Sequence, residues 1–267
     1  MPTATSRDGT PIGYSRDGSG PAVVLVDGAL CHRAVGPNRR LAERLSRDLT
    51  VFTYDRRGRG ESGDAAPYAV AREVEDLGAL IDAAGGSAYV YGISSGGALA
   101  MEAAKRLPGK VAALALYEIP FVVDDTRPPV SKDFPGQLER FLAAGQRGAA
   151  VKLFMRDAVR LPSVLVAAMP LFVGGWKKNK AIAHTLPYDV AVMGDGQRGE
   201  AVPADRWRAV TVPTLVACGE KSPDWVRHAA AQLSQVLPNA RHRTLAGQRH
   251  YVKPDAMAPV LVEFFAA

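Results

Sequence analysis

The chain has 267 residues, of which 47% are hydrophobic and 22% are charged, and its formal net charge is +6. This length and composition predict one soluble domain with a large core. No uncharged apolar run approaches the length of a membrane span, and the polar N-terminus lacks the apolar core of a signal peptide. We therefore expect a cytoplasmic protein without a membrane partner. Basic residues alternate with acidic ones instead of forming a stripe with aromatics, which disfavours a nucleic-acid partner.

Short apolar runs alternate with helical segments over residues 1–120. Strands are predicted over 10–15, 22–26, 50–54, 88–91 and 111–116, and helices over 41–49, 70–84 and 98–107. Continuous apolar strands between helices predict an α/β fold with a mostly parallel central sheet flanked by helices. Ligands of such sheets bind beyond the carboxyl ends of the strands. Asp27, Asp55, Ser94 and Glu118 all fall at such ends.

The strand–helix alternation stops between residues 121 and 206. Helices are predicted there over 134–146, 149–161, 163–172 and 178–184, with breaks at Pro162, Pro170, 174–175 and Pro187. We interpret 121–206 as an inserted helical cap, which leaves 1–120 and 207–267 as the core. The core resumes with a strand at 214–219, a helix at 223–237, a strand at 241–245 and a helix at 257–265.

A serine at position 94 lies between Gly92 and Gly96 in the pattern G-x-S-x-G. An apolar strand precedes it and a helix rich in small residues follows, which is the context that this motif needs. The turn would hold Ser94 in a strained backbone conformation, with its hydroxyl above a helix N-terminus that favours developing negative charge. A glycine-rich turn of this kind could instead bind phosphate, but the strand–helix context favours a nucleophile.

Three motifs together resemble the α/β-hydrolase superfamily. They are the turn D-x-R-G-x-G-x-S that begins at Asp55, the G-x-S-x-G motif around Ser94, and G-x-x-H that ends at His250. The resemblance covers nearly the whole chain outside the cap. It implies the α/β-hydrolase fold with a helical cap, and a triad in which Ser94 attacks an acyl carbon while His250 takes its proton. We expect Asp55 to fix its turn through hydrogen bonds to the backbone.

The same resemblance implies an oxyanion hole of two backbone N–H groups. One belongs to Ser95, directly after the nucleophile, and the other to Ala29, in the loop after the strand 22–26. Many family members carry His-Gly in that loop, where this chain has Asp27-Gly28. Leu30, beside Ala29, and Trp176, in the cap, are expected to bind substrate, because binding sites are mostly apolar and often lie between domains.

The acid of the triad has two candidates. Its usual family position follows the strand 214–219, but this chain has Ser222 where aspartate is expected. Asp224 comes two residues later, at a helix start where an acid is favoured by the helix dipole alone. Glu118 follows the strand 111–116, a position that supplies the acid in some relatives. Buried acids are rare unless they are paired, so the sequence favours Glu118 over Asp224.

The resemblance implies a serine hydrolase that cleaves an ester or lactone through an acyl-enzyme, and the apolar cap indicates a hydrophobic small molecule as the substrate. Aspartate is the nucleophile in the dehalogenases and epoxide hydrolases of the superfamily, so Ser94 argues against both. Two alternatives remain open: a non-hydrolytic catalyst for cyclisation, elimination or cofactor-free peroxide chemistry, and a ligand-binding receptor. No motif implies a metal, no cofactor is needed, and Cys31 and Cys218 match no metal-site spacing.

Overall fold

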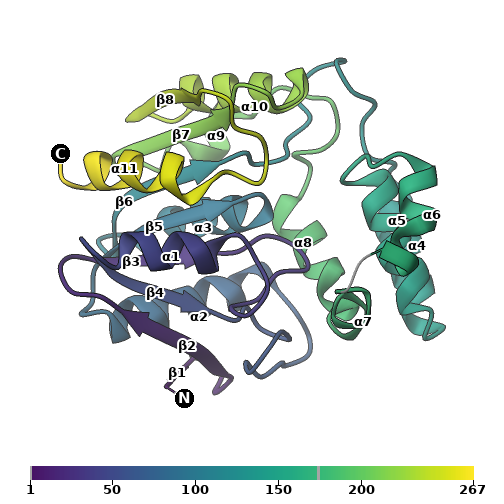
Figure 1. Cartoon of the computed structure of the whole chain (residues 1–267), viewed down its shortest axis with the longest axis horizontal. Coiled ribbons are helices and arrows are strands. Elements are labelled where there is room, and N and C mark those ends of the chain that lie inside the picture. Colours follow the sequence, from purple (N-terminus) through teal and green to yellow (C-terminus); the bar gives the residue numbers. More distant parts are fainter. Residues whose placement is uncertain (1, 173–174) are drawn as a thin grey trace.

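Eight strands form one sheet in the part of the chain that the computed structural model describes, which is all of it except residues 1, 173 and 174. In sequence order they are β1 (Thr3–Thr5), β2 (Pro11–Asp17), β3 (Ala22–Val26), β4 (Thr50–Tyr54), β5 (Ala88–Ile93), β6 (Val111–Tyr117), β7 (Thr214–Gly219) and β8 (Ala240–Leu245). Their order across the sheet is β1-β2-β4-β3-β5-β6-β7-β8 (Figure 1). The pairs β1–β2 and β2–β4 are antiparallel and all other pairs are parallel. The predicted fold class is thus confirmed.

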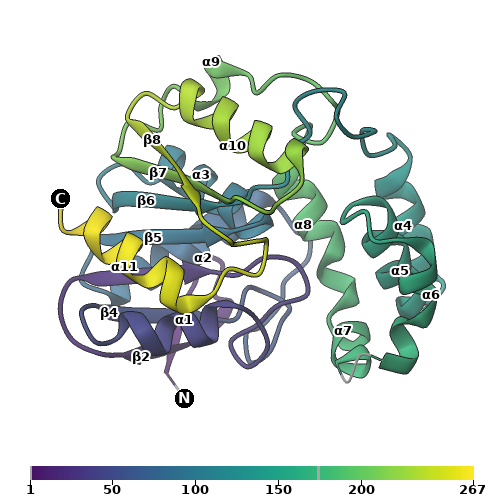
Figure 2. The same cartoon turned by 45° about the horizontal axis from the view of Figure 1, so that its top comes forward.

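Helices cover both faces of this sheet (Figures 1 and 2). One face carries α1 (Asn38–Leu45) and α11 (Pro254–Phe265), and the other carries α2 (Val70–Ala83), α3 (Ser95–Arg106), α9 (Ala204–Trp207) and α10 (Asp224–Val236). Successive strand side chains point to opposite faces. Val24 accordingly packs towards the α2–α3 side, while Leu25 packs towards α1 and α11. Both are almost completely buried, which explains why this strand is apolar without interruption.

A separate group of helices lies beside the carboxyl ends of the strands (Figure 1). These helices are α4 (Phe134–Ala143), α5 (Arg147–Asp157), α6 (Ser163–Phe172) and α7 (Trp176–Ala181), and the short helix η1 (Ala183–Thr185) and α8 (Leu186–Met193) follow. They have their own apolar cluster, and α8 packs on α3 of the core. The proposed boundaries at 121 and 206 stay a prediction. Of the helices that the structure describes, none is long and apolar enough to cross a bilayer.

Two prolines of this region do not break helices as the sequence predicts. Pro187 is the second residue of α8, where a proline lacks only an N–H that would have no partner in the helix. Pro170 lies inside α6. The expected break at 174–175 falls partly outside the described residues, since 174 is not described. Pro187 matters most, because the prediction treats it as a helix break and therefore does not include α8.

Candidate active site

Ser94 lies in a sharp turn between β5 and α3, with φ 57° and ψ −133°. Its N–H donates a hydrogen bond to the carbonyl of Tyr117, at 3.0 Å. A Cβ atom on Gly92 would lie 2.6 Å from the carbonyl oxygen of Gly96, and one on Gly96 would lie 2.4 Å from that of Val26. Only glycine fits at either position, so the two glycines of the motif allow the turn that the sequence predicts.

Both predicted oxyanion donors lie in segments that adjoin Ser94. A Cβ atom on Gly28 would lie 3.4 Å from the Ser94 Oγ, so the peptide that joins Gly28 to Ala29 runs beside this hydroxyl. Ser95 is the first residue of α3, and the N–H groups of a first helical turn have no acceptor within the helix. Two backbone segments thus come together at one hydroxyl, as an oxyanion hole requires.

Glu118 follows β6 and is joined to His250, the predicted base. The His250 Nδ1 and the Glu118 Oε2 are 2.9 Å apart. The other carboxylate oxygen accepts a hydrogen bond from the N–H of Gly219, at 2.8 Å, and another from the Ser222 hydroxyl. Burial raises the pKa of Glu118, but the hydrogen bonds from His250, Ser222 and Gly219 outweigh it and hold the pKa below its ordinary value. Glu118 therefore presents an ionised carboxylate to the imidazole.

The second acid candidate lies elsewhere. Asp224 is exposed in the first turn of α10, where it pairs with Arg227. Between the two candidates, the described contacts thus join His250 to Glu118. They also give Ser222 a part that sequence reasoning missed, since its hydroxyl supports the carboxylate of Glu118. The signal for this was present: a serine at the usual acid position implies that the acid comes from another strand.

Tyr117 connects the serine turn to the loop that carries His250. Its backbone carbonyl accepts the N–H of Ser94, and its hydroxyl donates to the carbonyl of Arg249, at 2.7 Å. Glu118 directly follows Tyr117, and His250 directly follows Arg249. Tyr117 therefore joins the Ser94 turn, after β5, and the His250 loop, after β8, to the carboxyl end of β6, the side of the sheet where ligands of parallel sheets bind.

The two predicted substrate-binding residues are both in or against the cap. Leu30 has φ 57°, is 6% exposed, and packs with Ala29 against the apolar cluster of the cap. Trp176 is half-buried on α7, close to Gly148 of α5, and lines a hollow of about 680 Å³. Ser94 is not among the described residues that line this hollow. Both substrate contacts stay predictions.

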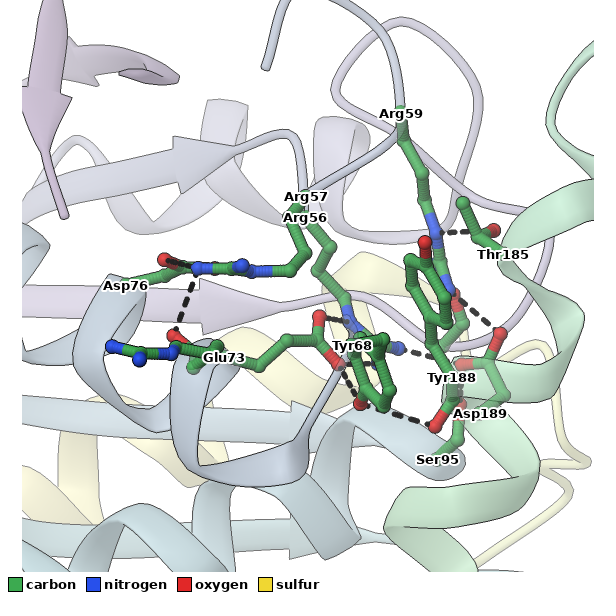
Figure 3. Close-up of polar contacts among 12 residues, drawn as sticks. Arg56, Arg57, Arg59, Tyr68, Glu73, Asp76, Ser95, Thr185, Tyr188 and Asp189 are labelled. Atoms are coloured by element: carbon green, nitrogen blue, oxygen red, sulfur yellow. Dashed lines mark hydrogen bonds and ion pairs between the residues drawn. The ribbon is translucent and has the colours of Figure 1, made fainter. Parts of the chain in front are cut away.

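The turn after β4 carries a buried ionic network (Figure 3). Asp55 fixes the turn as expected, because its carboxylate accepts the N–H of Arg33 at 2.8 Å and that of Glu61 at 2.9 Å. Arg56 and Arg59, each 1% exposed, both pair at 2.6 Å with Asp189 of α8. Sequence reasoning missed Asp189, because no local motif marks it.

Asp27, between β3 and the oxyanion loop, is a buried acid of a different kind. Burial raises its pKa to about 7, although Arg59, the backbone N–H of Asn38 and Arg56 all favour the charged form. Among the described residues, its Oδ1 has no hydrogen-bond partner. Within the same residues, no cluster of three or more His, Cys, Asp or Glu side chains is placed to hold a metal ion.

Comparisons with known proteins agree with this fold. The sequence profile of the family described as alpha/beta hydrolase fold matches residues 21–256. Lipase LipV of Mycobacterium tuberculosis is 39% identical over 111 residues, which is 41% of each chain, so the match spans less than half of that relative. A pimeloyl-[acyl-carrier protein] methyl ester esterase of Xanthomonas oryzae pv. oryzae is 30% identical over 257 residues, 87% of this chain and 89% of the relative. The crystal structure of an alpha/beta hydrolase from Sphaerobacter thermophilus has 53% identity and a TM-score of 0.91, and covers 99% of this chain and 100% of its own.

Proposed function

Because the chain belongs to the α/β-hydrolase fold family, we propose that it is a serine hydrolase that cleaves a carboxylic ester or lactone of a hydrophobic small molecule. The observation that carries the proposal is the 2.9 Å contact between the His250 Nδ1 and the buried Glu118 carboxylate, together with the strained turn of Ser94, whose N–H is bonded to the carbonyl of the residue before Glu118. A serine hydroxyl is a weak nucleophile at neutral pH, so it needs a neighbouring base that is held in one orientation.

In the first half of the reaction, Ser94 Oγ attacks the carbonyl carbon of the ester while His250 Nε2 accepts its proton. Glu118 accepts a hydrogen bond from Nδ1, which fixes the tautomer and stabilises the imidazolium. The carbonyl oxygen becomes an oxyanion, and the N–H groups of Ala29 and Ser95 donate to it. When the intermediate collapses, the C–O bond to the alcohol breaks and His250 returns the proton to the leaving oxygen.

In the second half, water hydrolyses the acyl-enzyme. His250 takes a proton from the water as its oxygen attacks the acyl carbon, and a second oxyanion forms in the same hole. The bond to Ser94 Oγ then breaks, and the serine recovers its proton from the imidazole. The acid product leaves, and the enzyme is restored without any further reactant.

Two observations support a hydrophobic substrate. Ala29 and Leu30, which flank the proposed oxyanion donor, pack against the apolar cluster of the cap, so groups attached to the reacting carbonyl meet apolar side chains. The two relatives described above also act on esters: one is a lipase and the other a methyl ester esterase. An ester or lactone with an apolar acyl chain fits both.

A fluorophosphonate probe tests the nucleophile directly, because the serine oxygen displaces fluoride from phosphorus and stays labelled. We expect the wild type to be labelled and the Ser94→Ala variant to be unlabelled. A p-nitrophenyl ester should also leave an acyl adduct on the Ser94 peptide, detected by mass spectrometry after a rapid acid quench. Undiminished labelling of Ser94→Ala would place the nucleophile elsewhere, and product formed without any acyl adduct or incorporated water would favour the non-hydrolytic alternative.

A further inference from the structure

The proposed oxyanion hole is built from two segments that are far apart in the sequence. One donor belongs to the peptide between Gly28 and Ala29, after β3, and the other to Ser95, at the start of α3. Catalysis requires both N–H groups to point at one oxygen, within about half an ångström of the productive geometry. A structural element that contacts both segments could therefore set the activity of the site.

Asp189 contacts the Ser95 segment directly. Its Oδ1 accepts a hydrogen bond from the Ser95 hydroxyl at 2.7 Å, and the same oxygen pairs with Arg56 at 2.6 Å. Asp189 is 1% exposed and lies in the first turn of α8 (Figure 3). Burial raises its pKa, but Arg59, Arg56 and the Ser95 hydroxyl outweigh burial and hold the pKa below its ordinary value. An ionised carboxylate thus fixes the residue that carries one donor.

Arg59 connects Asp189 to the Gly28–Ala29 segment. Its Nη2 pairs with the Asp189 Oδ2 at 2.6 Å, and its Nη1 donates to the carbonyl oxygen of Gly28 at 2.7 Å. Thr185, just before α8, accepts from the Arg59 Nε at 3.1 Å. The Gly28 carbonyl and the Ala29 N–H belong to the same peptide group. A cation bonded to that oxygen orients the peptide plane and withdraws electron density from its nitrogen, which makes the N–H a stronger donor.

A neighbouring pair in the same turn gives a matched comparison. Arg57 is as buried as Arg59 and binds Asp76 through two hydrogen bonds of 2.6 and 2.7 Å. Its other partners are Asp8, between β1 and β2, and the carbonyl of Arg72, in α2. Removal of either arginine would break a buried ion pair and lower stability, so stability alone does not distinguish the two residues. Arg59 differs from Arg57 in one respect that concerns the site, namely its bond to the oxyanion loop.

We infer that Asp189 and Arg59 are positioning residues of the oxyanion hole, which couple α8, a helix of the cap, to both backbone donors. Displacement of α8 would move Ser95 and the Gly28–Ala29 peptide together, so the position of the cap sets the transition-state stabilisation of the site. This inference rests on the proposed function and assigns the residues that make its oxyanion hole depend on the cap.

The test compares Arg59→Met and Asp189→Asn with the control Arg57→Met, using turnover of p-nitrophenyl butyrate. Loss of an oxyanion donor costs about 100- to 1,000-fold in kcat, so misalignment should cost about 10- to 100-fold with KM nearly unchanged. Arg57→Met should lower thermal stability yet keep kcat within about twofold. Arg59→Lys, which retains a cation near the Gly28 carbonyl, should recover part of the loss.

A second readout separates positioning from general damage to the fold. A trifluoromethyl ketone adds the Ser94 oxygen to its carbonyl carbon, and its oxygen becomes an anion that needs the hole. Its affinity should fall in Arg59→Met in parallel with kcat, while the affinity of the matching secondary alcohol, which forms no anion, should stay as in the wild type. If Asp189→Asn does not fold, Ser95→Ala removes only the hydroxyl that Asp189 binds and should lower kcat in the same way.

The outcomes divide clearly. Equal losses of kcat in Arg57→Met and Arg59→Met, or a change confined to KM, would overturn the inference. An active wild type whose Arg59 and Ser95 variants keep full kcat would overturn it as well, and would leave the proposed function standing. A wild type that neither turns over esters nor reacts with the fluorophosphonate would remove the proposed function, and the inference with it.

Discussion

Glu118 and Asp27 are two buried acids at the carboxyl ends of β6 and β3, and their pKa values are shifted in opposite directions. Glu118 is met by three groups, His250, Ser222 and the N–H of Gly219, and its pKa falls below the ordinary value. Asp27 keeps one oxygen without a partner among the described residues, and burial raises its pKa to about 7. The difference teaches that burial alone does not determine the charge of an acid: three hydrogen bonds favour the charged form of Glu118, whereas one hydrogen bond, from the Asn38 N–H, and the charges of two arginines favour that of Asp27.

The largest expected effect is on turnover, from Glu118→Gln. A glutamine amide at this place favours the wrong tautomer of His250, so kcat should fall by about 1,000- to 10,000-fold with little change in the fold. The control is Asp224→Asn, which should keep kcat within about twofold because that carboxyl is exposed and bound to Arg227. Steady-state kinetics with a p-nitrophenyl ester measure both, and the opposite pattern would assign the acid to Asp224.

The next effect is on stability, from Asp27→Asn. The folded protein holds a proton on Asp27 up to about pH 7, whereas the unfolded chain loses it near the ordinary value of 3.8. The folded state therefore binds more protons between these pH values, and the free energy of unfolding falls as the pH rises, by on the order of 4 kcal/mol in total. Denaturant unfolding from pH 4 to 8 should show this decline in the wild type and its absence in Asp27→Asn. Asp224→Asn should keep the wild-type slope; a declining Asp27→Asn would attribute the effect to another group.

A smaller effect is expected from Ser222→Ala. The variant removes one of the three donors to Glu118, so the pKa of that carboxyl should rise towards its ordinary value and kcat should fall by about tenfold. The lowered pKa of Glu118 stabilises the fold above the pKa that this carboxyl has in the unfolded chain, and this contribution is lost as the pH falls. Because the contribution is smaller in the variant, its acid unfolding should begin at a higher pH than that of the wild type. A Ser222→Ala variant with wild-type kcat and acid stability would show that two donors suffice.

The smallest expected effect, in absolute rate, is a gain of turnover. In the Glu118→Gln background, Ser222→Asp returns a carboxylate to the usual acid position of the family, beside residue 118. We expect a rise of kcat of about tenfold over Glu118→Gln alone. The matched variant Ser222→Asn in the same background supplies shape without charge and should give no gain, so equal rates in the two double variants would exclude rescue by the carboxylate.

Much of the fold could be predicted because the strands are apolar without interruption. Val23 to Val26 and Thr50 to Tyr54 are buried on both faces, and such runs leave few alternatives to a covered parallel sheet. The helix α8 could not be predicted by treating Pro187 as a breaker. Proline ends a helix in its interior but fits its first turn, and only the position of the helix start, which tertiary packing decides, distinguishes the two cases.

The candidate site was predictable where its residues lie in local motifs. Ser94 has its glycines, and His250 has its place before the last helix. Glu118 could be inferred from a missing aspartate at Ser222. Asp189 could not be inferred, because its partners Arg56 and Arg59 lie 133 and 130 residues away and no spacing along the chain marks such a contact. Long-range ion pairs appear only once the fold brings the segments together.

The contacts of Tyr117 affect the order in which the parts of the candidate site come together during folding. Through its carbonyl and its hydroxyl, this one residue of β6 touches the turn of Ser94 and the segment just before His250. Ser94 and His250, the proposed nucleophile and base, therefore cannot come together until β6 has formed and the last strand and the loop after it have packed against it. During refolding, ester turnover should recover later than the bulk of the helical signal, so activity reports the final closure of the chain rather than its collapse.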